Sequence, residues 1–218
     1  MIGLDRGRLL GWTVLVSALA ILGYASRAAG GKPPADAAYQ YSTAVGGIVQ
    51  YGIILAIVLA IARPEWRRLL ALRAPASYGR ALTSALGSFA VVYAVAGIVS
   101  TYSHPDREQG LTPDTWDPHR VSPYVVNFVV FVAVAPAVEE LTFRGLGYSL
   151  LAPLGRLPAI LWVGVAFGLA HGLVDALPIL IAFGAALAWI RARTESVYPG
   201  MLVHGLFNAI ALIVSVTT

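Results

Sequence analysis

The stretch VSPYVVNFVVFVAVAPAVEELTFRG, residues 121–145, decides how this chain folds. No charge occurs in residues 121–138, and two adjacent glutamates, Glu139 and Glu140, follow directly. About twenty consecutive apolar residues are enough for a helix to cross a bilayer. Ionised carboxylates at that depth are costly, and they usually mark a functional site or a buried ion pair. The stretch therefore predicts a membrane helix that carries such a site.

The composition places the whole chain in the membrane class. Of its 218 residues, 58% are hydrophobic and 12% are charged, with a mean hydropathy of +0.74, whereas a soluble domain carries about 25% charged residues. We therefore predict an all-α, polytopic transmembrane helical bundle of about seven to eight helices. The chain has no cysteine, which excludes disulfides, thiolate metal sites and a cysteine nucleophile.

Seven apolar segments have spanning or nearly spanning length. They are residues 9–25, 42–62, 81–102, 122–150, 158–173, 176–190 and 198–216. The first three fall in a predicted N-terminal part, 1–120, and the other four in a predicted catalytic core, 121–218. We expect the two parts to form one integrated membrane domain.

The arginines predict the orientation. They gather before the first segment, between the second and third, between the fourth and fifth, and after the sixth. With a cytoplasmic N-terminus all four groups lie inside, as the positive-inside rule requires. The net charge of +4 then reflects membrane topology, so we expect a lipid bilayer and no nucleic acid as a partner. The start also resembles a signal peptide, but the poor cleavage site at Ala25-Ser26-Arg27 favours an uncleaved first helix.

The spacing of the ionisable residues separates the two glutamates. Glu140 and Arg144 are four residues apart and can pair on one helix face. Glu139 is rotated by about 100° from its neighbour, so it points elsewhere. Counting about 1.5 Å per residue along each helix puts four polar residues at similar depth. They are Glu139, His171, His204 and Asn208.

These four residue types can hydrolyse an amide. A carboxylate in an apolar site can act as a general base on a water shared with an imidazole. A second imidazole and an amide can donate hydrogen bonds to a developing oxyanion. Zinc is the nearest alternative cofactor, because Glu139, His171 and His204 form a valid ligand set. Each residue taken alone could instead be structural, since transmembrane histidines and Glu–Arg pairs also hold helices together.

Three motifs resemble those of the CAAX protease and bacteriocin-processing family, also called Abi or Rce1-like. The motif E-E-x-x-x-R occurs at residues 139–144, F-x-x-x-H at 167–171 and H-x-x-x-N at 204–208. The resemblance implies an intramembrane glutamic endopeptidase without a metal cofactor. It implies that Glu139 and His171 activate water, that His204 and Asn208 form the oxyanion hole, and that Glu140 and Arg144 support them.

The substrate class does not follow from the resemblance alone. Eukaryotic relatives process prenylated CAAX proteins, but arginine outnumbers lysine fourteen to one here, which is typical of a GC-rich prokaryotic genome. We therefore expect a multi-pass protein of a prokaryotic inner membrane that cleaves a peptide or a membrane-protein segment. The alternatives are a non-catalytic bacteriocin-immunity or scaffold protein and a proton-coupled transporter, although the chain is short for a transporter. The sequence does not indicate an oligomeric state.

Overall fold

The computed structural model describes residues 4–31, 34, 36–103, 105, 108, 113 and 115–217. Within these residues the chain is helical and contains no strand, which confirms the predicted fold class. Each of the seven predicted apolar segments corresponds to a helical segment. In chain order these are α1 (Arg6–Ala28), α2 (Tyr41–Ala62), α4 (Tyr78–Val99), the long segment Val121–Leu154, α9 (Arg156–Ala170), α10 (Leu177–Thr194) and α11 (Tyr198–Thr217). Among the described residues, all of these except α9 are long and apolar enough to cross a membrane.

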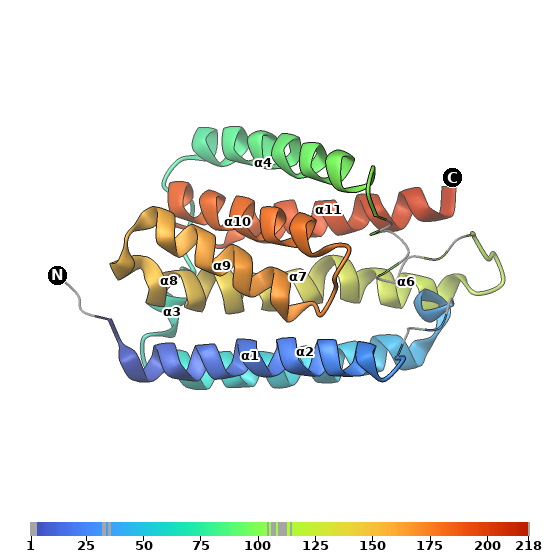
Figure 1. The fold of residues 1–218 in the computed structure, drawn as a ribbon, viewed down its shortest axis with the longest axis horizontal. Helices are drawn as coiled ribbons and strands as arrows, with labels where there is room; N and C mark the ends of the chain where they lie inside the picture. Colours follow the sequence, from blue (N-terminus) through green and yellow to red (C-terminus); the bar gives the residue numbers. More distant parts are fainter. Residues whose placement is uncertain are drawn as a thin grey trace.

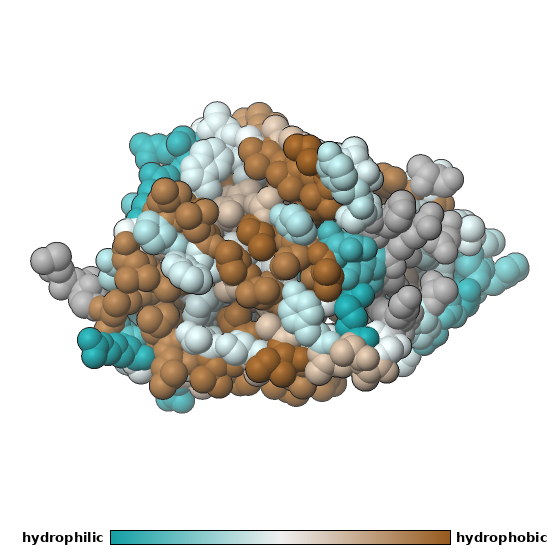
Figure 2. Space-filling view, in the orientation of Figure 1, coloured by the Kyte–Doolittle hydropathy of each residue, from teal (hydrophilic) through white to brown (hydrophobic). Residues whose placement is uncertain are grey.

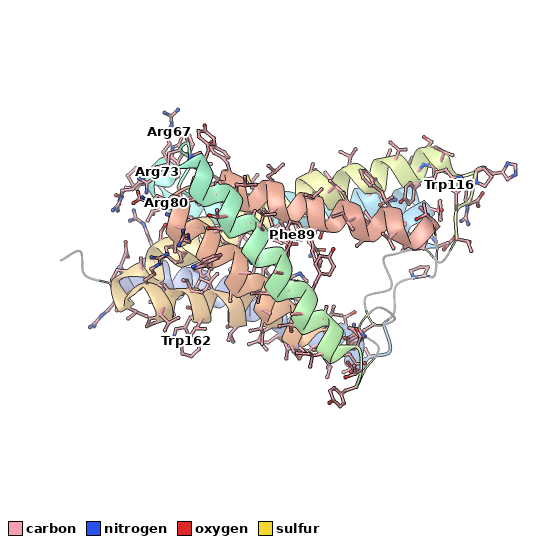
Figure 3. The ribbon with its side chains drawn as sticks, turned by 90° about the horizontal axis from the view of Figure 1, so that it is seen from above. Arg67, Arg73, Arg80, Phe89, Trp116 and Trp162 are labelled. Atoms are coloured by element: carbon pink, nitrogen blue, oxygen red, sulfur yellow. The ribbon has the colours of Figure 1, made fainter. Side chains whose placement is uncertain are left out.

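Most of the helices run along the long axis of the molecule (Figure 1). Helices α1 and α2 lie together on one side and α4 lies on the opposite side, where Figure 3 shows it crossing α10 and α11 obliquely. The start of α1 and the end of α11 lie at opposite ends of the molecule. Arg67, Arg73 and Arg80 lie at the end of the molecule where α1 begins, and Trp116 lies at the opposite end. The predicted orientation depends on arginines gathering at one end of the molecule, as these three do.

The visible face is apolar across its middle and more hydrophilic toward its ends (Figure 2). Large apolar side chains such as Leu22, Leu82 and Leu202 are exposed on several helices. An exposed apolar surface this extensive is unfavourable in water and is expected where lipid covers it.

The long segment Val121–Leu154 is not a uniform α-helix. It contains α6 (Val121–Val129), a wide π-helical turn (Val130–Val134), α7 (Ala135–Glu140), a second π-helical turn (Leu141–Gly147), α8 (Tyr148–Leu151) and a short 3-10 turn (Ala152–Leu154). Pro136 is the second residue of α7. It has no backbone N–H to donate, which helps to interrupt the regular α-helical hydrogen bonding there. Glu139 and Glu140 therefore lie on a short α-helix between two π-helical turns, a feature that is frequent at functional sites.

Helix α1 packs against the C-terminal part of the chain, residues 121–217, at two places. Near its start, Trp12 Nε1 donates a hydrogen bond of 2.9 Å to the carbonyl oxygen of Thr142, in the second π-helical turn. Near its end, Gly23 lies against Gly172, where a Cβ on Gly23 would come within 3.1 Å of the Gly172 Cα. Gly172 also has a φ of +64°, a conformation that favours glycine. These contacts join α1 to the second π-helical turn and to the turn that follows α9.

Candidate active site

A cavity of about 210 Å³ lies where the long segment, α9 and α11 meet. Its polar wall is formed by Tyr51, Glu139, His171, His204 and Asn208. The structure thus brings together all four residues that the sequence predicted at matched depth. The remaining wall is apolar and includes Phe167, Phe183 and Phe207.

Glu139 is the central group of this cavity. Its Oε2 atom lies 3.9 Å from His171 Nε2 and 3.7 Å from His204 Nε2. Both separations are longer than a direct hydrogen bond, and a water molecule can bridge polar atoms at such distances. The Glu139 side chain is 15% exposed, so the carboxylate is largely shielded yet reachable from the cavity.

The hydrogen bonds of the two imidazoles indicate which ring nitrogen faces Glu139. His171 Nδ1 lies 2.7 Å from the carbonyl oxygen of Phe167. A carbonyl can only accept, so we assign the proton to Nδ1, which leaves Nε2 of the neutral ring as an acceptor. His204 Nδ1 lies 3.2 Å from Glu140 Oε1, and a carboxylate paired with arginine also accepts. Both rings therefore present Nε2 to the cavity.

Glu140 and Arg144 form the ion pair that their spacing predicted. Arg144 Nη1 donates to Glu140 Oε1 over 2.8 Å, and both side chains are completely buried. Arg144 Nη2 also donates to the carbonyl oxygen of Gly184 over 3.1 Å, and its guanidinium lies 4.2 Å from the centre of the Phe167 ring. The other carboxylate oxygen, Glu140 Oε2, lies so close to Gly200 that no larger residue would fit there without displacing Glu140.

The structure differs from the predicted division of the two glutamates in one respect. His204 contacts Glu140 through Nδ1 and faces Glu139 through Nε2, so it links the two carboxylates. The ion pair therefore orients a ring that forms part of the cavity wall. Asn208 lies one turn further along α11 and donates from Nδ2 to the carbonyl oxygen of Phe131 over 2.9 Å. The NH₂ group of Asn208 has two donors, so its second hydrogen is not used by the bond to Phe131.

Tyr51 of α2 is a member of the site that the sequence did not predict. Its hydroxyl donates to Glu139 Oε1 over 2.6 Å, across 88 residues of sequence. The only signal was the polar pair Gln50-Tyr51 within an otherwise apolar run, residues 44–62. A phenol that donates to a carboxylate stabilises its ionised form and fixes its orientation.

We expect Tyr51→Phe to reduce turnover by about tenfold, because it removes one hydrogen bond to a charged group. Loss of this donor also removes the contact that fixes the orientation of the Glu139 carboxylate. Initial rates of cleavage by the purified protein measure the effect. Tyr41→Phe is the matched control, since Tyr41 lies on the same helix and donates only to Ser122 Oγ, over 2.8 Å. An unchanged rate in Tyr51→Phe would show that this residue only packs.

The donor types of Glu139, His171 and His204 suit zinc, as the sequence indicated. Within the part of the chain that the structure describes, no group of three or more His, Cys, Asp or Glu side chains is arranged to hold a metal ion.

Part of the chain matches a known protein family. Residues 121–210 match the family described as type II CAAX prenyl endopeptidase Rce1-like. The matched residues include Glu139, Glu140, Arg144, His171, His204 and Asn208. The match confirms the resemblance noted from the three motifs, and it leaves α1, α2 and α4 outside. No curated protein and no solved structure matches the chain.

Proposed function

Since residues 121–210 match the family described as type II CAAX prenyl endopeptidase Rce1-like, we propose that this integral membrane protein is an intramembrane glutamic endopeptidase. The observation that carries the proposal is the position of Glu139, whose Oε2 faces the Nε2 atoms of two histidines in a shielded cavity. The family supports a protease. The glutamate mechanism and the substrate are our own inferences.

The first step is activation of water. A water between Glu139 Oε2 and His171 Nε2 transfers a proton to the carboxylate as its oxygen attacks the carbonyl carbon of the substrate. Phe167 holds the His171 ring through Nδ1, so Nε2 stays aimed at that water. Tyr51 holds the other oxygen of Glu139, which leaves Oε2 as the proton acceptor.

The second step is stabilisation and collapse of the tetrahedral intermediate. His204 donates from Nε2 to the oxyanion while its Nδ1 stays against Glu140 Oε1. Asn208 supplies its second amide hydrogen to the same oxygen, the first being held by Phe131. The intermediate then expels the amine, which receives the proton from Glu139, and the carboxyl product forms.

We propose that the substrate is a peptide or a membrane-protein segment reached within the bilayer. We also propose that the protein lies in a prokaryotic inner membrane with a cytoplasmic N-terminus, on the basis of its arginine content and distribution. A zinc-dependent form of the same reaction and a non-catalytic immunity or scaffold role are the alternatives that the next experiment separates.

The proposal is tested by comparative membrane proteomics of cells with wild-type protein and with Glu139→Ala or His171→Ala. We expect peptides with new termini in the wild type and their loss in both variants, with normal amounts of folded protein. Identical termini in all three strains would contradict proteolysis and favour a non-catalytic role. The same termini, once found, provide an assay in which full activity after exhaustive chelation would eliminate the zinc-dependent alternative.

A further inference from the structure

A second, larger cavity of about 850 Å³ adjoins the candidate active site. It lies between α1 and α2, which run together along one side of the molecule (Figure 1). Its walls carry leucines of α1 and isoleucines of α2, and its floor includes Thr142 and Phe143 of the long segment. Tyr51, Glu139 and His171 line both cavities, so the groove leads directly to the proposed reacting groups.

The rim of this groove is apolar and exposed. Leu22 on α1 is 67% exposed, and Ile53 on α2 is 57% exposed. Both helices have the length and composition of membrane spans, so this rim faces lipid rather than water. A molecule that enters between them must therefore present an apolar surface.

Gln50 is the exception on the apolar wall. It is exposed, and no hydrogen bond from its side chain to the described residues is formed. Gln50 is the tenth residue of α2, which places it about 14 Å from the start of the helix at about 1.5 Å per residue. An amide at that depth is costly unless a hydrogen-bonding partner is supplied. The residue is also the immediate neighbour of Tyr51, which contacts Glu139.

The chemistry of this amide selects among apolar occupants. A primary amide offers both a donor and an acceptor, which matches a peptide unit. An aliphatic or isoprenoid chain offers neither, and an intact transmembrane helix has already satisfied its own backbone groups. Only a locally extended segment of polypeptide combines an apolar surface with free backbone N–H and C=O groups in the membrane.

We infer that the groove between α1 and α2 binds an apolar, locally extended polypeptide segment, and that Gln50 pairs with a backbone peptide group of that segment. The inference rests on the proposed function, because the groove would deliver the adjoining peptide bond to Glu139. It assigns substrate recognition to two helices that lie outside the matched family residues.

Binding without turnover tests the inference. Purified Glu139→Ala protein in lipid vesicles is mixed with a synthetic membrane-spanning polyleucine peptide that has a central Gly-Pro pair and a photoreactive leucine beside it. We expect this peptide to cross-link to α1 and α2 at the groove, as located by mass spectrometry. Adding Q50L should lower the yield about tenfold, the effect of one hydrogen bond, and Q50N should retain most of it.

Matched probes and a matched variant make the result decisive. An uninterrupted polyleucine helix and a photoreactive farnesyl compound should label the groove weakly, and neither should respond to Q50L. Combining Q50L with Ile48→Gln, which puts an amide on the same helix outside the groove, should not restore labelling. Equal labelling by the three probes, or labelling that is insensitive to Q50L, would overturn the inference. Because no cleavage is measured, this failure is distinct from failure of the proteolysis experiment.

Discussion

Glu139→Gln should abolish hydrolysis while leaving the fold intact. An amide of the same size can still accept the hydrogen bond from Tyr51, so the geometry of the cavity is kept. It cannot accept a proton from water, and loss of a general base costs about 10²–10⁴-fold in rate. Initial rates of cleavage of a validated substrate and the thermal unfolding midpoint in detergent measure the two parts of this prediction.

Glu140→Gln is the matched control, because it makes the same chemical change at the adjacent residue. Arg144 then loses the carboxylate that pairs with it at 2.8 Å in a fully buried site. We therefore expect a lower unfolding midpoint in Glu140→Gln and an unchanged midpoint in Glu139→Gln. Full activity in Glu139→Gln together with a fully inactive but stable Glu140→Gln would reverse the roles assigned to the two glutamates.

The candidate site was largely predictable because its members lie on helices of recognisable length or, for His171, directly at the end of one. For such helices the residue spacing determines both the face and the depth of a side chain. Glu140 and Arg144 lie one turn apart on the same segment, and their pairing depends on that segment alone. The site forms once the helical segments that carry its residues pack together at matched depth, as they do for Glu139, His171 and His204.

The contacts that sequence did not reveal depend on packing between distant helices or on local changes of helical pitch. Tyr51 reaches Glu139 from α2, and no periodicity indicates which side chain of α2 faces the site. The two π-helical turns on either side of α7 interrupt the 3.6-residue repeat that spacing arguments assume. His204 links both carboxylates because α11 lies across α7, an arrangement of helices that the four-residue spacing of His204 and Asn208 does not specify.

Arg144→Met should be the most destabilising of these substitutions. Glu140 and Arg144 have no exposed surface, and removal of one partner of a buried ion pair costs about 3–5 kcal/mol because the remaining charge is uncompensated. Arg73→Met provides the contrast. Arg73 pairs with Glu195 at 3.1 Å, but their side chains are 55% and 62% exposed, and exposed pairs contribute about 0–1 kcal/mol. Chemical unfolding in detergent measures both values.

The double variant Glu140→Gln/Arg144→Met separates charge from packing. If the cost of Arg144→Met comes from the lone buried carboxylate, neutralising that carboxylate should recover most of the lost stability, since paired removal of buried charges is often nearly neutral. Arg144 also donates to Gly184 and lies over the Phe167 ring, and the double variant lacks these contacts too. A double variant as unstable as Arg144→Met would therefore mean that these contacts, which join the long segment to α9 and α10, hold the site together instead of the ion pair.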